Sequence, residues 1–344
     1  MVSERRVDLK VIEGTGPRPG GPAARPRWGG PEPERQHSGE TGLRPVDVLL
    51  LGYLLLTGLL ILGMPKNLPW WPLHLAGRLV AVVAILRLVP HRPRNRGLAL
   101  VRDWYPIAAF LPLYSELSVL TRLLTTEHYD TLIVTWEAAL LGGQPSQSWR
   151  VIFPSRLLSE YLHFSYFYYY FVPTTLCLWL YARGERARFS RALTAILGVF
   201  LACCLIYLIF PVVGPYHHFG HPAAESWGGF FAPLVHRIVE GGSSLGTAFP
   251  SSHTAVSVCA WLAAWRLCRP AFWVLTAIVP ALALATIYGG FHYALDTLAG
   301  AALGAGVALL APGVHGRLTR LVSRKKAQES RLPFASQGPG EPLR

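Results

Sequence analysis

The stretch "GTAFPSSHTAVSVCAW", residues 246–261, opens an apolar part of the chain with two serines and a histidine, Ser251, Ser252 and His253. A titratable ring is costly inside a bilayer. His253 therefore either lies at the membrane rim without a role or takes part in chemistry. The serines that follow Pro250 also predict where a helix begins, because either one is a good N-cap. The first turn of that helix would present free N–H groups to an anion.

The overall composition is typical of a membrane protein. Of the 344 residues, 51% are hydrophobic and only 15% are charged. The apolar residues form blocks close to the roughly 20 residues that cross a bilayer as a helix. The sequence therefore predicts an all-α polytopic membrane helical bundle. Eight candidate spans can be drawn, over residues 46–64, 73–89, 104–121, 160–181, 192–213, 253–268, 271–289 and 293–311.

The distribution of charge predicts the orientation. The formal net charge is +13, and Lys and Arg are concentrated at the two ends of the chain and in the segments 91–102 and 183–191. With eight spans these basic segments all fall on one side, which the positive-inside rule makes cytoplasmic. Both termini are then cytoplasmic. Because no basic stretch is interleaved with aromatic residues, membrane topology explains the charge better than nucleic-acid binding, and we expect no nucleic-acid partner.

Four regions follow from these spans. Residues 1–45 are expected to be a disordered basic cytoplasmic tail. Residues 46–99 hold two N-terminal transmembrane helices, residues 100–312 hold a six-span core, and residues 313–344 form a second basic cytoplasmic tail. Within the core, residues 127–149 are too charged to span, and they predict an interfacial helix on the outer face followed by a Gly-Gly-Gln-Pro turn.

The five cysteines carry little functional information. Their number is odd and their spacing is not that of a metal site, so neither a disulfide framework nor a zinc site is supported. We expect them to be small apolar side chains within the helices.

Polar groups from distant parts of the sequence fall on one membrane face. His253 begins the sixth span, and His292 and Asp296 begin the eighth, each at its outer end. A histidine and an aspartate four residues apart lie on the same side of a helix. The carboxylate can then fix one imidazole nitrogen and leave the other as a nucleophile or base. Together with the anion site before His253, these groups suit phosphoryl transfer through a phosphohistidine.

Two motifs carry a resemblance to a known family. "FPSSHTA" (249–255) and "YGGFHYALDTLAG" (288–300) resemble the second and third signature motifs of the type 2 phosphatidic acid phosphatase superfamily. "HYALD" and "YLIFPVVGPYHHF" (207–219) are similar to the branch that contains the inositol phosphorylceramide synthases. So are the stretches 130–146 and 159–173. The resemblance covers roughly residues 100–312 and implies a phosphatase-like or phosphotransferase-like membrane core.

The resemblance implies roles for individual residues. His292 would be the nucleophile, Asp296 would orient it, and His253 would be the general acid for the departing alcohol. Ser251 and the backbone of Ser252 would hold phosphate oxygens. The family implies no metal and no other cofactor.

The sequence also departs from the family pattern. The superfamily has a Lys and an Arg in its first motif and an Arg in its third, but the third-motif position here is near Thr286. The first-motif region is best matched by "FPVVGPYHHFG" (210–220), which has no Lys or Arg. It provides Tyr216, His217 and His218 as candidate phosphate-binding residues, with His221 just beyond it. The phosphate charge would then be met by helix N–H groups, by these histidines, or by Arg150 or Arg156.

The predicted function is the transfer of a phosphoryl headgroup at the cell membrane, on its non-cytoplasmic face. The donor would be a phospholipid such as phosphatidylinositol, and the acceptor a lipid alcohol such as ceramide. The main alternative is hydrolysis, a lipid phosphate phosphatase. Two further alternatives are a non-catalytic membrane protein, such as a transporter, and a metal protein that uses the histidine loop.

Other polar and aromatic residues have competing interpretations. For the residues Tyr166 to Tyr170, packing is favoured over substrate binding. For the histidine loop, contact with substrate is favoured over metal binding. Gly300 and Gly304 continue the His292–Asp296 helix face and predict close helix packing. Glu116 fits equally well a buried hydrogen-bonded group and a site residue.

Overall fold

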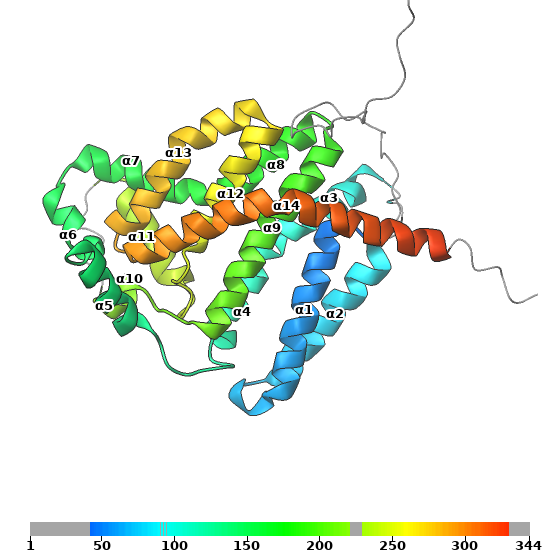
Figure 1. Cartoon of the computed structure of the whole chain (residues 1–344), viewed down its shortest axis with the longest axis horizontal. Coiled ribbons are helices and arrows are strands. Elements are labelled where there is room, and N and C mark those ends of the chain that lie inside the picture. The colour runs from blue at the N-terminus through cyan, green and yellow to red at the C-terminus, as the bar shows by residue number, and fades with distance from the viewer. Residues whose placement is uncertain (1–41, 90, 92, 94, 221–228, 330–344) are drawn as a thin grey trace, which may run out of the picture. The chain divides into compact units, whose positions relative to one another are not determined.

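The computed structural model describes residues 42–89, 91, 93, 95–220 and 229–329. The regular elements among these residues are all helices, apart from an isolated bridge between Val212 and Thr247 (Figure 1). The all-α prediction is therefore confirmed. Residues 1–41 and 330–344 of the expected tails lie outside the described residues, as does His221.

The helices follow one another along the whole described chain. They are α1 (Pro45–Gly63), α2 (Trp71–Leu88), α3 (Arg96–Ala108), α4 (Phe110–Leu120), α5 (Asp130–Leu141), α6 (Pro145–Ile152), α7 (Arg156–Phe167), α8 (Val172–Ala182), α9 (Arg186–Ile209), α10 (Pro215–His218), α11 (Phe231–Gly242), α12 (Ser252–Leu267), α13 (Arg269–Tyr288) and α14 (Ala294–Glu329). Two short 3-10 helices, η1 (Pro65–Asn67) and η2 (Tyr168–Phe171), complete the set.

Five helices are long and apolar enough to cross a membrane, and each coincides with a predicted span. They are α1, α2, α9, α13 and the Ala294–Arg324 part of α14. Of the other three predicted spans, two are divided into shorter helices and one is a single short helix. Residues 104–121 divide at Ala109 into α3 and α4, just after Pro106, which removes a backbone donor from the helix. Residues 160–181 form α7 and α8 joined by η2, and α12 has 16 residues.

The last helix is longer than its predicted span. Residues 293–311 were expected to cross the membrane, with a basic tail from residue 313. In the structure α14 continues through Pro312 to Glu329, so the first part of that basic segment is helical. The basic residues Arg317, Arg320 and Arg324 therefore lie on the same helix as Asp296.

The centre of the bundle consists of α9, α12, α13 and α14. α12 packs against each of the other three, and most extensively against α14. A Cβ atom at Gly300 would overlap the carbonyl oxygen of Ser251, and one at Gly304 would overlap the carbonyl oxygen of Ala255. The prediction of close helix packing at these glycines is therefore confirmed. All five cysteines are buried and free, as the sequence predicts.

A partly buried ion pair between Arg78 and Glu116 attaches the α1–α2 hairpin to α4. Both carboxylate oxygens of Glu116 accept hydrogen bonds from the guanidinium of Arg78, at 2.6 and 3.0 Å. His74 Nδ1 lies 2.7 Å from the same carboxylate, and Thr57 on α1 accepts a bond from Arg78 Nε. Glu116 is therefore a hydrogen-bonded structural group, the first of the two interpretations that its sequence allows, and not a site residue.

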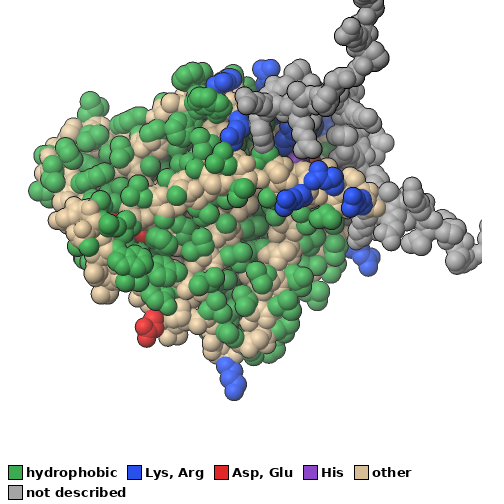
Figure 2. Space-filling model, in the orientation of Figure 1, with side chains coloured by type: hydrophobic (Ala, Val, Ile, Leu, Met, Phe, Trp, Pro, Cys, Tyr) green, Lys and Arg blue, Asp and Glu red, His purple; other side chains and the backbone are tan. Residues whose placement is uncertain are grey.

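The surface agrees with a protein that lies in a membrane. Figure 2 shows one face covered largely by hydrophobic side chains, with Lys and Arg gathered toward the end of α14. Large apolar side chains on α1 and α2, among them Leu55, Leu59 and Val80, are more than half exposed. Burying such surface in lipid removes it from water. The chain is a multi-pass membrane protein.

Candidate active site

The helix that begins at Ser252 starts as the sequence predicts. Ser251 is the N-cap of α12, and its side chain accepts a hydrogen bond from Thr254 N at 3.3 Å. The first intrahelical bond runs from Ala255 N to Ser251 O, so the N–H groups of Ser252 and His253 precede it and point out of the helix start. Such a first turn is a site for an anion.

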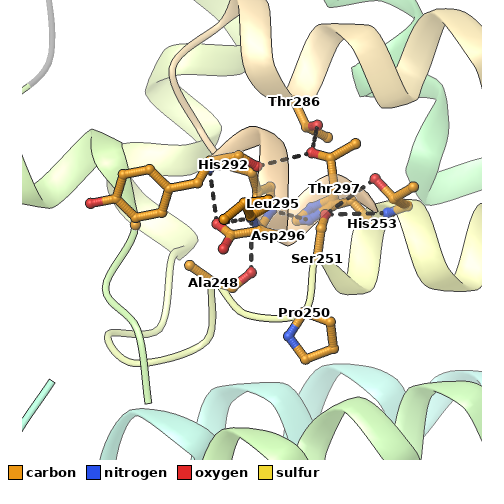
Figure 3. A network of polar contacts seen from close by, with 12 residues as sticks. Ala248, Pro250, Ser251, His253, Thr286, His292, Leu295, Asp296 and Thr297 are labelled. Atoms are coloured by element: carbon orange, nitrogen blue, oxygen red, sulfur yellow. Dashed lines mark hydrogen bonds and ion pairs between the residues drawn. The ribbon is translucent and has the colours of Figure 1, made fainter. Parts of the chain in front are cut away.

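The loop before α12 is tied to the start of α14. Ser251 N donates to the backbone oxygen of Asp296 at 2.9 Å, and Tyr207 of α9 donates to the Pro250 oxygen at 2.9 Å. The helix starts of α12 and α14 therefore lie side by side, as Figure 3 shows.

Three predicted residues come together where these helix starts meet. His292 Nδ1 lies 3.1 Å from the Ala248 oxygen and 3.5 Å from Asp296 Oδ2 (Figure 3). Its other nitrogen, Nε2, lies 3.4 Å from His253 Nδ1. Asp296 is completely buried, and its Oδ2 also accepts a bond from Tyr293 N at 2.9 Å. The two histidines, 39 residues apart in sequence, are thus in direct contact.

The neighbours of His292 determine where its proton lies. Nδ1 faces two oxygen acceptors, so this nitrogen carries the proton and Nε2 keeps a free electron pair. Burial lowers the pKa of His292, which lies in the loop between α13 and α14, and the ring is therefore neutral at pH 7. A neutral imidazole with a free Nε2 is the nucleophilic form.

Thr286 holds the turn that precedes His292. Its carbonyl oxygen accepts the backbone N–H groups of Phe291 and His292, at 3.0 and 2.9 Å. Its hydroxyl lies 2.7 Å from that of Thr297 on α14. The position at which the family resemblance would place an arginine is therefore occupied here by a group that fixes the backbone.

Two tyrosines enclose the ring of His253. The Tyr166 hydroxyl lies 3.2 Å from His253 Nε2, and the two rings stack with their centroids 4.8 Å apart. The Tyr169 ring lies 4.3 Å away from His253, centroid to centroid. Packing was the favoured interpretation for this tyrosine run, and these two rings do pack, but they pack against a candidate site residue.

Sequence reasoning missed two buried carboxylates on α5. Glu137 Oε1 accepts hydrogen bonds from Ala294 N at 2.5 Å and Leu295 N at 3.3 Å, which caps the start of α14. Asp130 accepts from Val213 N and Gly214 N, both at 2.9 Å. Asp130 also accepts from the hydroxyl of Tyr293 at 3.1 Å.

The location of α5 explains why they were missed. The stretch that contains α5 was expected to be an interfacial helix because it is too charged to span, whereas Asp130 and Glu137 are 3% and 0% exposed. Burial raises the pKa of Glu137 to about 6, although the two backbone N–H groups lower it. Their spacing of seven residues, two turns on one helix face, is the signal that could have revealed them.

The predicted phosphate-binding residues of the histidine loop lie in other surroundings. Tyr216 is buried, and its ring lies 5.9 Å from that of Phe291, the residue before His292. His217 is exposed, with Nε2 3.0 Å from the Ser243 hydroxyl, and the exposed ring of His218 lies against Phe219. Across the described residues, no group of three or more potential ligands is placed to hold a metal ion.

The described residues also show which charges border the histidine pair. None of their Lys or Arg side chains makes an ion pair or hydrogen bond with His253, His292 or Asp296. The donors at hand are the N–H groups at the start of α12 and the hydroxyls of nearby side chains.

Comparison with known protein families identifies a match to this chain. A family model described as the PAP2 superfamily matches residues 131–310, just over half of the chain. The match begins in α5 and ends in α14, so it includes α12 and all three residues of the histidine–aspartate group. No curated protein and no solved structure matches the chain.

Proposed function

Because the chain belongs to the PAP2 superfamily, we propose that it is a lipid phosphotransferase that moves inositol phosphate from phosphatidylinositol to a lipid alcohol such as ceramide. Membership in the superfamily makes the chain a membrane enzyme of the phosphatase/phosphotransferase class. The observation that carries the proposal is the contact between His292 Nε2 and His253 Nδ1, with His292 Nδ1 held by Ala248 and Asp296.

In the first step, His292 Nε2 attacks phosphorus. The bond between phosphorus and the diacylglycerol oxygen breaks, and that oxygen takes the proton from Nδ1 of His253, which enters the step as an imidazolium and leaves it as a neutral ring. Diacylglycerol leaves, and the headgroup phosphate stays on His292 as a phosphohistidine. Asp296 and the Ala248 oxygen stabilise the positive charge that develops on the His292 ring.

In the second step, the acceptor alcohol reverses the proton transfer. Its hydroxyl proton passes to His253 Nδ1, its oxygen attacks phosphorus, and the nitrogen–phosphorus bond breaks. His292 is then restored with its free electron pair. Water in place of the alcohol would give hydrolysis, the alternative function, so access of the acceptor decides between the two outcomes.

The substrate's phosphate has to displace one of the rings. Two nitrogens 3.4 Å apart are in contact, which leaves no room for a phosphorus atom between them. His253 therefore turns away from His292 as phosphate binds, while its proton stays within reach of the leaving oxygen. The N–H groups of Ser252 and His253 at the start of α12 would hold the phosphate oxygens.

The charges that border the site favour a phosphodiester. A phosphomonoester carries about −1.5 to −2 charges at pH 7, whereas the phosphodiester of a phospholipid carries one. Backbone N–H groups and hydroxyls suit the smaller charge, and the described residues place no Lys or Arg on the histidine pair. This supports headgroup transfer over dephosphorylation of a lipid monophosphate.

The distribution of basic residues along α14 supports a reaction at the non-cytoplasmic face of the membrane. Arg317, Arg320 and Arg324 lie near the far end of α14 from Asp296. If the basic end faces the cytoplasm, the histidine pair lies at the non-cytoplasmic face of the cell membrane, and the lipid substrates come from the outer leaflet.

The test uses purified protein in vesicles with phosphatidylinositol labelled in its inositol. With ceramide present we expect label in a ceramide product, and His292→Ala and Asp296→Asn should abolish it. His128→Ala, which changes an exposed histidine near the start of α5, serves as the matched control and should have no effect. Labelled inositol phosphate released irrespective of acceptor would show a hydrolase. Activity that survives both site changes would refute the phosphohistidine mechanism and favour a non-catalytic or transport role.

A further inference from the structure

The sequence motif of His292 contains a residue that orients its ring, whereas the motif of His253 does not. His292 has Asp296 four residues away on its own helix start, an arrangement visible in the sequence. His253 has no such neighbour in its own motif. Its Nδ1 faces His292 Nε2 at 3.4 Å, and the group facing its other nitrogen is the Tyr166 hydroxyl at 3.2 Å.

We propose that Tyr166 is the positioning residue of His253, holding Nε2 so that the proton on Nδ1 faces the leaving oxygen. This inference rests on the proposed function. The proton positions in the contacts from His292 through His253 to Tyr166 support it. Since His292 Nε2 accepts, His253 Nδ1 donates, and the Nε2 of the neutral resting ring accepts from the hydroxyl of Tyr166. In the imidazolium that acts as general acid, Nε2–H donates to the same hydroxyl oxygen, so Tyr166 can hold either form.

Tyr166 is held firmly enough for this role. It lies in the last turn of α7, is 2% exposed, and its ring lies 4.5 Å from that of Phe291, the residue before His292. The position of the hydroxyl is therefore set by the same turn that sets His292. Tyr169 covers His253 as well, with ring centroids 4.3 Å apart.

Loss of the Tyr166 hydroxyl should impair protonation of the leaving group. When His253 turns away from His292 to admit the phosphate, the contact between the two histidines is lost. Its ring is then oriented by the Tyr166 hydroxyl and by stacking alone. Without the hydroxyl, the ring can rotate and direct its proton away from the diacylglycerol oxygen. The attack by His292 does not depend on that proton, so in the first step only reactions whose leaving group must be protonated should be slowed.

The experiment assays the variant Tyr166→Phe, which keeps the ring and removes the hydroxyl, with two substrates that differ in their leaving group. Phosphatidylinositol has a diacylglycerol leaving group that needs a proton. 4-Nitrophenyl inositol phosphate releases 4-nitrophenolate, which does not. A lost hydrogen bond of ordinary strength corresponds to roughly a tenfold loss of rate. We expect the single-turnover rate of diacylglycerol release from phosphatidylinositol to fall by about that factor, and the single-turnover rate of 4-nitrophenolate release to stay within about twofold of wild type.

Tyr168→Phe is the matched control. Tyr168 lies two residues away, and its hydroxyl lies 3.0 Å from that of Thr175, so the variant removes a similar bond without touching His253. It should leave both rates unchanged. The ratio of the two rates does not depend on the folded fraction, so partial misfolding cannot mimic the expected result.

Two other outcomes have distinct meanings. An equal loss on both substrates, or no loss on either, would show that Tyr166 only packs, and the inference would be wrong while the proposed function stood. If wild-type protein released neither diacylglycerol nor 4-nitrophenol, the proposed function itself would fail and the inference would fail with it.

Discussion

Glu137 should be as necessary to the site as the motif residues, although it lies more than 110 residues before His253. Its Oε1 accepts from Ala294 N at 2.5 Å and from Leu295 N at 3.3 Å. A hydrogen bond to a charged group contributes about 1.5–3 kcal/mol, and the longer bond is near the limit of good geometry. Glu137→Ala should therefore lower the free energy of unfolding by about 2–4 kcal/mol, because two donors at the buried start of α14 lose their acceptor.

The effect on activity follows from what α14 carries. Its first turn contains Asp296 and directly follows His292, so loosening that turn misplaces the nucleophile and the group that orients it. A displacement of about 1 Å can reduce the rate about 100-fold. We expect kcat of Glu137→Ala to fall by roughly that factor with phosphatidylinositol and with 4-nitrophenyl inositol phosphate alike, since the nucleophile itself is affected.

Glu137→Gln separates the acceptor from the charge. The glutamine keeps a carbonyl oxygen for Ala294 N, and burial already raises the pKa of Glu137 to about 6. Because the folded-state pKa lies above the ordinary value of 4.5, proton uptake stabilises the folded protein fully below pH 4.5, and this contribution is lost as the pH rises through about 6. Wild type should therefore gain stability over Glu137→Gln as the pH falls from 7 to 5.

The measurements are equilibrium unfolding in detergent and steady-state rates in vesicles. The control is Glu127→Ala, which removes an exposed acid just before α5 and should change stability by less than about 0.5 kcal/mol. If Glu137→Ala proved as stable and as active as that control, the capping role argued for Glu137 would be refuted.

Two further predictions concern the bundle. Gly304→Ala should destabilise by about 1–3 kcal/mol, because its Cβ would overlap the Ala255 oxygen. Gly306→Ala, with nothing within 4 Å of the new Cβ, should be neutral or stabilising; equal effects in unfolding titrations would contradict the packing argument. Glu116→Gln should lower stability by about 3–5 kcal/mol because it leaves the Arg78 charge buried. Breaking the more exposed Arg183–Glu185 pair by Arg183→Ala should change stability by less than about 1 kcal/mol, and similar losses in both variants would argue against a structural role for Glu116.

The features that could be read from the sequence are those set by local spacing. Apolar blocks give the helices, and four-residue spacing places His292 and Asp296 together. Ser251 was identifiable as an N-cap because capping depends on neighbouring residues. The His253–His292 contact needed only the added premise that both helices begin at the same membrane face.

The features that escaped prediction depend on tertiary contacts. An acid on an amphipathic helix faces water unless another element covers it, and what covers Asp130 is a loop more than 80 residues later. The tyrosine run is equally ambiguous, because aromatic residues in a membrane helix pack in most settings and only the position of His253 gives Tyr166 a further contact. The division of residues 160–181 depends on how the pieces pack, which periodicity does not record, whereas the break after Pro106 follows from a local loss of a backbone donor.

The glycines of α14 connect the packing of the bundle to the geometry of its site. His253 and His292 belong to two different helix starts, and the distance between them depends on how closely α12 and α14 approach. Gly300 and Gly304 allow the backbone of α14 to touch the backbone of α12 at Ser251 and Ala255. The bond from Ser251 N to the Asp296 oxygen then fixes the helices along their axes. A side chain at Gly300 would push apart the two rings that must share one phosphate, so this glycine is expected to affect catalysis as well as stability.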